Sequence, residues 1–245
     1  MQRAMRERKP SHMKQLLERP QGKIGLGIAV VALLAIIGGT YYVFGGNGAR
    51  TTATGAVTAP TLAPMGSGKA FTIDSSGSEA SFTIDEVHFG QPTTVVGKTS
   101  QVAGQIQVDK DDPSKSTVGQ IKVDLTGLKT DDFLRNNTIQ GRILETGDSS
   151  NQFAVFTPKS ISGLPENVTV GQGFSFKITG DLTIHGVTRS ATFDTTVTLE
   201  SDSKLSGQAQ TTIKYKDFNI NIPDVPSVTG VSDTVKLALN FTAHS

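Results

Sequence analysis

Histidines and clustered carboxylates are the side chains of this sequence that could carry acid–base, nucleophilic or metal chemistry. His185 is the most suggestive, because it lies in the stretch ITGDLTIHGVTRSATFDTTV (residues 178–197), beside a glycine and between threonines. His12, His88 and His244 do not share a local spacing that would bring two imidazoles onto one metal ion. The chain contains no cysteine, which excludes disulfides, thiolate metal ligands and cysteine nucleophiles.

The densest group of carboxylates is the run DKDDPSK of residues 109–115. Calcium is the chemistry it suggests, but the run lacks the glycine and the distal glutamate of an EF-hand loop. We interpret it as a solvated hairpin tip. No nucleophile and base can be paired from the sequence, so we predict no catalytic residue, no metal site and no cofactor. Catalysis or metal binding by His185 remains open beside a structural role at a turn.

The elements that position these residues are strands. From residue 70 onward apolar residues recur with a period of two, and Thr, Val and turn residues are abundant. Only residues 130–146 suggest a helix or irregular structure. An antiparallel sheet with one apolar face must cover that face, either as a two-sheet sandwich or by closing into a barrel, and composition does not choose between them. The alternating runs are EASFTIDEV, SQVAGQIQVD, GQIKVDL, GQGFSFKI, TTIKY and DTVKLALNFTA.

Residues 174–197 can be paired as a hairpin whose two-residue turn is His185-Gly186. This pairing places apolar and polar side chains on opposite faces. One face is then almost wholly apolar, the other is polar, and Lys177 meets Asp194. A slip of one residue would exchange the faces of one strand. We therefore predict this register, with Gly186 supplying the positive φ of the turn. The apolar face pairs Ile184 with Val187, Leu182 with Arg189, Gly180 with Ala191, Ile178 with Phe193, Phe176 with Thr195 and Phe174 with Val197.

The N-terminal part of the chain has the pattern of a membrane anchor. Residues 1–23 hold seven Lys or Arg and two Glu, and residues 24–44 are 21 residues without a charge. About 20 apolar residues span a bilayer, and the basic flank stays in the cytoplasm. We predict a single-pass signal anchor with the C-terminal part exported, to the periplasm or outside the cell. A cleaved signal peptide is the alternative, although its apolar core is usually shorter.

Residues 45–69 are rich in Gly, Thr, Ala and Pro, which is typical of a flexible tether. The predicted domains are thus a cytoplasmic segment (1–23), the anchor (24–44), a linker (45–69) and a β domain (70–245). No basic patch with interleaved aromatic residues follows the leader, so we do not expect nucleic-acid binding. No oligomeric state is predicted.

Several segments resemble one known family. GDLTIHGVTRSATFD (180–194) is similar to the signature of the YceI-like polyisoprenoid-binding proteins, and the likeness covers most of residues 70–245. One departure is Asn219, where the family's Asp-Phe-Gly-Ile motif has glycine. Another is DSSGS (74–78), which lacks the histidine that many relatives carry there. The other similar segments are FTIDSSGSEASFTIDE, VAGQIQVD, LKTDDFLRNNTIQ, NQFAVFTPKSI and KYKDFNINIPDVPSVTGVSDTVKLALNFTA.

The resemblance implies an all-β, extended lipocalin-like antiparallel barrel that holds an isoprenoid or another long amphiphilic lipid in its interior. The function expected is sequestration or transport of that lipid beside the membrane, without catalysis. A structural or adhesive β domain with a solid core is the alternative, and a lipid-modifying enzyme is a further one. The ligand-binding residues expected are Phe133, Phe153, Phe156, Phe174, Phe176, Ile178, Leu182, Ile184, Phe193 and Val197.

Overall fold

The computed structural model describes residues 56–63 and 68–245. They belong to the second of two compact units, residues 48–245. Within the described residues, no helix is both long enough and apolar enough to span a bilayer. The predicted leader and anchor lie outside the described residues, as does most of the predicted linker. Their assignment therefore stays a prediction.

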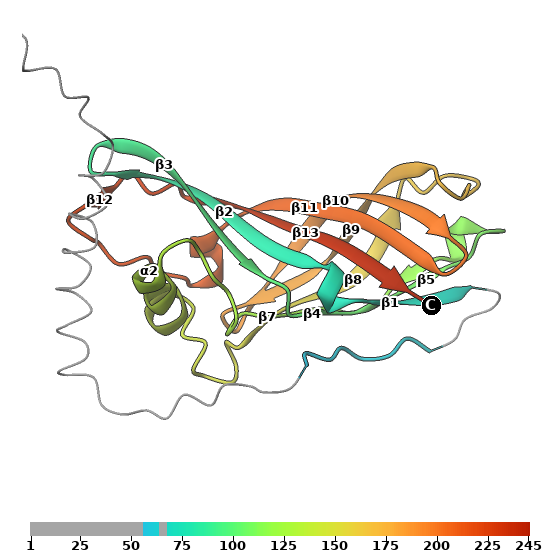
Figure 1. Cartoon of the computed structure of the whole chain (residues 1–245), viewed down its shortest axis with the longest axis horizontal. Helices are drawn as coiled ribbons and strands as arrows, with labels where there is room; N and C mark the ends of the chain where they lie inside the picture. Colours follow the sequence, from blue (N-terminus) through green and yellow to red (C-terminus); the bar gives the residue numbers. More distant parts are fainter. Residues whose placement is uncertain (1–55, 64–67) are drawn as a thin grey trace, which may run out of the picture. The chain divides into compact units, whose positions relative to one another are not determined.

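The unit is all-β, as the alternation predicts. Its single antiparallel sheet has 13 strands and curls strongly into a half-barrel (Figure 1). The main path of hydrogen-bonded neighbours is β4-β7-β8-β9-β10-β11-β13-β1-β5-β6. The strands are β1 (Lys69–Ile73), β2 (Glu79–His88), β3 (Gln91–Thr99), β4 (Val102–Ala103), β5 (Gln105–Val108), β6 (Thr117–Val118), β7 (Ile121–Asp124), β8 (Phe153–Ser162), β9 (Gly173–Ile184), β10 (Val187–Ser201), β11 (Lys204–Lys214), β12 (Val228–Thr229) and β13 (Thr234–His244).

Strand β13 is the branch point of the sheet. One of its edges pairs with β11 along its whole length, and the other pairs first with β2 and then, near its end, with β1. Strands β4 and β5 are separated only by Gly104, and they pair with β7 and β1 respectively. The chain itself therefore links the two ends of the main path, which accounts for the strong curl.

The predicted hairpin is confirmed in full. Val187 pairs with Ile184, Phe193 with Ile178 and Val197 with Phe174, in the predicted register. The turn residues His185 and Gly186 have φ of 52° and 70°. On the outer face the side chains pair as predicted too, because Lys177 Nζ donates to Asp194 Oδ1 and threonine hydroxyls meet across the strands. Alternation of apolar and polar residues was sufficient to define this element.

The two ends of the sheet differ, and we name them for what they carry. The helical end holds the β9–β10 turn, the α-helix α2 (Phe133–Thr138) and the π-helix η3 (Ile139–Ile143), with the β2–β3 hairpin projecting beyond the first residue of β13. The loop end holds the β10–β11 turn, where Lys69 Nζ donates to the carbonyl of Asp202. Helix α2 and η3 fall in the stretch of residues 130–146 that was expected to be helical or irregular.

Two apolar clusters line the concave face. The cluster toward the loop end is tightly packed, and its most deeply buried large side chains are Phe71, Leu199, Leu205 and Val102. The cluster toward the helical end includes many side chains that stay half-buried, such as Phe82, Phe176 and Phe193. Each cluster therefore combines fully buried side chains with half-buried ones, and Phe176 belongs to both.

Candidate functional site

The candidate site is a row of inward-facing residues that crosses six strands. Strand pairing places these residues side by side, from β9 through β10, β11, β13 and β2 to β3. Four of the six side chains are small, and the two large ones are half-buried. Of the small residues, Thr195, Thr99 and Ala80 are buried, with 4%, 5% and 9% of their surface exposed. The row consists of Phe176, Thr195, Ala209, Leu239, Ala80 and Thr99.

Phenylalanine rings beside this row lie against the wall of the sheet. A Cβ added at Gly97 would collide with the ring of its cross-strand partner Phe82. One added at Gly207 would lie 2.8 Å from the ring of Phe241. A ring that lies over glycine backbone does not project into the interior, and only glycine allows that approach. These glycines therefore allow both rings to lie against the sheet.

The residues predicted to bind a ligand fall mostly on this inward face. Phe156 and Phe193 meet edge to face with centroids 4.8 Å apart, and Phe174 and Phe176 stack at 5.7 Å. Half-buried side chains on this face are the ones a ligand could touch without displacing the core. Those buried on the inward face are Phe156, Ile178, Leu182, Ile184 and Val197, and those half-buried on it are Phe174, Phe176 and Phe193.

Two of the predicted residues lie elsewhere. Phe153 shares a face with Val155 and Lys122, opposite the face that carries Phe156, and Lys122 Nζ sits 3.7 Å from the centre of its ring. Phe133 is the first residue of α2 and is 73% exposed. The structure therefore does not bring Phe133 and Phe153 together with the other eight.

Several inward residues were absent from the sequence prediction. Phe82, Ile213 and Leu237 are half-buried and pack against the cluster toward the helical end, and Ala209 lies in the small-residue row. The alternation of apolar and polar residues predicts these strands. It could therefore also have indicated which residues of β2, β11 and β13 face inward. The prediction used that signal only around the central hairpin.

The helical end of the concave face is covered by η3. Leu144 N donates to the carbonyl of Ile139 at 2.8 Å, the five-residue spacing of a π-helix. Ile143 and Leu144 pack against the cluster beneath, and Ile139 is buried. Such wide turns are rare and occur frequently at functional sites. They place two apolar side chains where a ligand would otherwise meet water.

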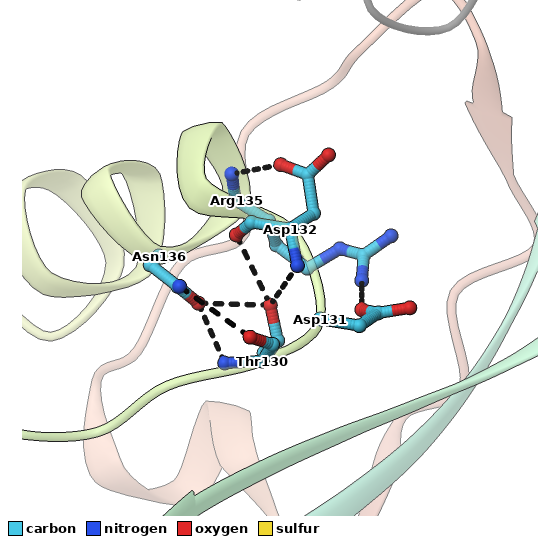
Figure 2. Close-up of polar contacts among 5 residues, drawn as sticks. All are labelled: Thr130, Asp131, Asp132, Arg135 and Asn136. Carbon is cyan, nitrogen blue, oxygen red and sulfur yellow. Dashed lines mark hydrogen bonds and ion pairs between the residues drawn. The ribbon is translucent and has the colours of Figure 1, made fainter. Parts of the chain in front are cut away.

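A polar network fixes the start of α2 (Figure 2). Asp132 Oδ1 caps the helix by accepting from Arg135 N at 2.7 Å, and Asn136 Oδ1 accepts from the backbone N and the hydroxyl of Thr130 at 2.6 and 2.8 Å. Arg135 Nη1 donates to Asp131 Oδ1 at 2.6 Å. Capping bonds satisfy backbone groups that a short helix leaves unpaired. The segment before α2 is also bridged to β3 through Lys129 and Lys98.

His185 has a partner that lies far away in the sequence. Its Nε2 lies 3.3 Å from Glu145 Oε2, and its side chain is only 17% exposed. Glu145 itself has a φ of 48° and follows η3 closely. The imidazole therefore joins the hairpin turn to the helical cover. Among the described residues, no group of three or more His, Asp or Glu is arranged to hold a metal ion.

We predict that the glycine of this turn matters more for stability than the histidine. Gly186→Val places a β-branched residue at a φ of 70° and should cost roughly 1–3 kcal/mol in the free energy of unfolding. His185→Ala removes one partly exposed contact and should cost less than about 1 kcal/mol. Urea denaturation of residues 48–245 measures both. A larger loss for His185→Ala than for Gly186→Val would show that the imidazole does more than join two segments.

The remaining charged groups form local pairs and caps. In the run of residues 109–115, Asp109 Oδ1 accepts from the backbone N of Asp111 and Asp112, which is a turn-forming role. Near the helical end, Lys216 Nζ donates to Asp233 Oδ1 at 2.6 Å. This hydrogen bond raises the pKa of Lys216 and lowers the pKa of Asp233, so both are ionised at neutral pH.

A shallow depression of about 360 Å³ is lined mainly by outward polar side chains of β9, β10 and β11, among them Lys177, Asp194 and Gln208. Phe176 and Thr195 of the small-residue row also contribute to its lining. A mainly polar, open lining does not suit an apolar tail. We therefore place the candidate site on the concave face.

Known proteins share this architecture. The model of the YceI-like domain matches residues 71–243. A curated relative, described as UPF0312 protein of Vibrio campbellii, is 28% identical over 177 residues, which is 69% of this chain and 87% of the relative.

Two solved structures share the fold. One is BcnA of Burkholderia cenocepacia, with a TM-score of 0.55 and 20% identity over 69% of this chain and 98% of BcnA. The other is a polyisoprenoid binding domain of Saccharophagus degradans implicated in plant cell wall breakdown, with a TM-score of 0.56 and 16% identity over 71% of this chain and 98% of that domain. The family match spans the whole curled sheet, from β1 to β13, and the chain belongs to the YceI-like family.

Proposed function

We propose that this protein binds the apolar tail of an isoprenoid, or of a related long-chain amphiphile such as a quinone, on the concave face of its half-barrel. The tail lies along the small-residue row and is enclosed as in an extended lipocalin-like barrel. The observation that carries the proposal is that row, whose large members Phe176 and Leu239 are half-buried and whose other members are alanine or threonine. The family relative whose description names polyisoprenoid binding supports it.

Burial alone can hold such a ligand. Each methylene group removed from water contributes about 0.8 kcal/mol, so roughly ten buried methylenes contribute about 8 kcal/mol before the cost of ordering the tail. No proton transfer and no covalent step is needed. The protein therefore sequesters or carries its ligand without transforming it.

Stabilisation by added ligand tests the proposal. Residues 48–245 are stripped of lipid, and a long-chain polyprenol or quinone is added at about a hundred times its Kd, which should contribute about 2.7 kcal/mol and raise Tm by roughly 5–10 °C. Gly97→Ala is a variant that should bind the ligand less well. The added Cβ displaces the ring of Phe82 toward the interior, so the ligand-induced rise in Tm should be smaller than in the wild type. An unchanged Tm at ligand saturation would contradict the proposal.

The location that we propose is the outer face of a membrane, with residues 1–23 in the cytoplasm and residues 24–44 as an uncleaved anchor. The basic leader and the uncharged run of 21 residues support it. Tethering raises the concentration of the domain beside the bilayer that supplies the lipid. Protease added to intact, wall-stripped cells should degrade residues 70–245 and spare the leader, and a protected domain would refute this orientation.

A scaffold without a ligand is the second candidate. It is favoured by the cluster toward the loop end, where Phe71, Leu199 and Leu205 are at most 2% exposed. A core that is equally solid throughout would leave no place for a tail. The two candidates differ in what happens when the small-residue row is filled.

A further inference from the structure

Among residues 56–63 and 68–245, most of the exposed large apolar side chains lie at the helical end. Phe133 on α2 is 73% exposed, and Phe89 at the tip of the β2–β3 hairpin is 46% exposed. Val96 on β3 is 37% exposed. The loop end contributes Val170, which is 48% exposed. Two phenylalanine side chains exposed to water contribute nothing to the stability of the fold, and their presence at one end makes that end a candidate interaction surface.

Phe89 has a backbone conformation that phenylalanine rarely adopts. It occupies the first position of a two-residue hairpin turn with a φ of 47°, and Gly90 follows with a φ of 76°. Turns of this kind favour Asn, Asp or Gly at that position. A bulky side chain there is strained as well as exposed, and strain of this kind concentrates at functional sites. The ring stacks on the neighbouring His88, at 4.9 Å between centroids.

Phe133 is displayed by an equally fixed element. The network of Thr130, Asp132 and Asn136 holds the backbone on both sides of it (Figure 2). Lys98 and Lys129 exchange backbone hydrogen bonds at 2.8 and 2.9 Å, which ties this segment to the β2–β3 hairpin that ends in Phe89. This bridge connects the segment before α2 to the end of β3 that lies away from Phe89.

The chain before β1 runs back toward this end. The side-chain amide of Gln107 donates to the carbonyl of Gly68, and Leu62 N donates to Gln105 Oε1 at 2.8 Å. Strand β5 approaches the loop end from Gln105 to Val108, so the chain followed backward from Gly68 to Leu62 moves toward the helical end. Upstream of it in the sequence is the uncharged run of residues 24–44.

Acidic side chains accompany both phenylalanines at this end. Arg135 pairs with Asp131, Lys216 with Asp233, and His185 contacts Glu145, whereas Asp85 and Glu86 lie on β2 close to the Phe89 turn. A surface without an excess of basic side chains has no preference for anionic headgroups. Phenylalanine side chains at its rim suit the boundary between headgroups and acyl chains, where apolar side chains of interfacial segments are buried.

We propose that the helical end docks onto a lipid bilayer by inserting Phe89 and Phe133 into its interface, so that a tail can pass between the bilayer and the concave face. The passage of a tail rests on the function proposed above, whereas the docking itself does not. Insertion of two aromatic rings is driven by the apolar area they remove from water. It is therefore insensitive to lipid charge and to salt.

The chain has no tryptophan, which makes the test direct. The full chain is reconstituted in phosphatidylcholine vesicles as three single-tryptophan variants, Phe89→Trp, Phe133→Trp and Val170→Trp, the last being the control at the loop end. Lipids brominated along the acyl chain quench indole at the depth that interfacial rings reach, so we expect at least about a twofold loss of fluorescence for the first two variants. The control should lose little, and added anionic lipid or salt should change nothing.

Absent quenching at positions 89 and 133, or equal quenching at all three positions, would overturn the docking proposal. The outcome is separate from ligand binding, which is measured by the Tm of stripped protein without vesicles. Quenching at both rings with no ligand-induced rise in Tm would leave the docking surface and refute the lipid carrier. A ligand-induced rise in Tm without quenching at positions 89 and 133 would support the lipid carrier and refute the docking surface.

Discussion

Ala209→Phe is expected to expel the lipid tail while leaving the domain folded. Ala209 lies at the centre of the small-residue row, between Thr195 on β10 and Leu239 on β13. A phenyl ring there occupies the place of roughly three methylenes of the tail, which costs roughly 2.4 kcal/mol of binding, or about fiftyfold in Kd. Calorimetric titration of stripped protein with a polyprenol measures this directly.

The stability of the stripped variant separates an open interior from a solid one. Filling space that is already free should change the free energy of unfolding by less than about 0.5 kcal/mol. Overpacking a solid core should cost roughly 1–3 kcal/mol. Gln208→Phe is the matched control, because it adds the same ring to the outer face of the same strand, opposite Thr196. Equal affinity of the two variants for the ligand would locate the tail elsewhere.

Gly180→Ala is expected to cause a large loss of stability. A Cβ at this position would collide with the backbone carbonyl of Thr157 and lie 2.8 Å from Cα of Pro158. Both obstacles belong to the backbone of β8, so no side-chain rotation relieves them, and the overpacking should cost roughly 3 kcal/mol. Urea denaturation of residues 48–245 gives the value.

The control is a glycine with open space around its Cα. Gly141→Ala meets nothing within 4 Å, and the change removes chain entropy from the unfolded state. We expect it to be neutral or to stabilise by about 0.5–1 kcal/mol. A Gly180→Ala variant as stable as Gly141→Ala would mean that β8 and β9 lie farther apart than the structure places them.

Local patterns were enough to predict the central hairpin. Its alternating side chains determine the register because a slip exposes apolar residues, and its turn needs one glycine. The same reasoning explains Asn219, the departure from the family's glycine. It has a φ of 55°, a left-handed conformation that asparagine tolerates better than most residues.

Pairings between distant segments could not be predicted in the same way. The face on which Phe153 lies depends on the register between β7 and β8, which are separated by the helical segment. The contact between His185 and Glu145 joins residues 40 apart in the sequence through a π-helix that no simple periodicity marks. The exposure of Phe133 depends on where α2 begins, and that is set by the cap at Asp132.

The small-residue row escaped prediction for a different reason. Alanine and threonine carry no strong signal of ligand binding, whereas phenylalanines do. The space inside a curled sheet depends on the summed volume of the side chains across a row. Calculating that sum requires the order of all six strands. The sequence alone therefore left an open interior and a solid core as equal possibilities.

Mass spectrometry of an organic extract from the natively purified protein tests the central claim most directly. The full chain is isolated from its membrane in mild detergent, washed free of bulk lipid, and extracted beside Ala209→Phe and Gln208→Phe prepared in the same way. We predict one long-chain isoprenoid or related amphiphile in near-stoichiometric amount from the wild type and from Gln208→Phe, and its depletion from Ala209→Phe. Extracts of all three proteins that contain the same trace of bulk membrane lipid, and nothing enriched over it, would contradict the account.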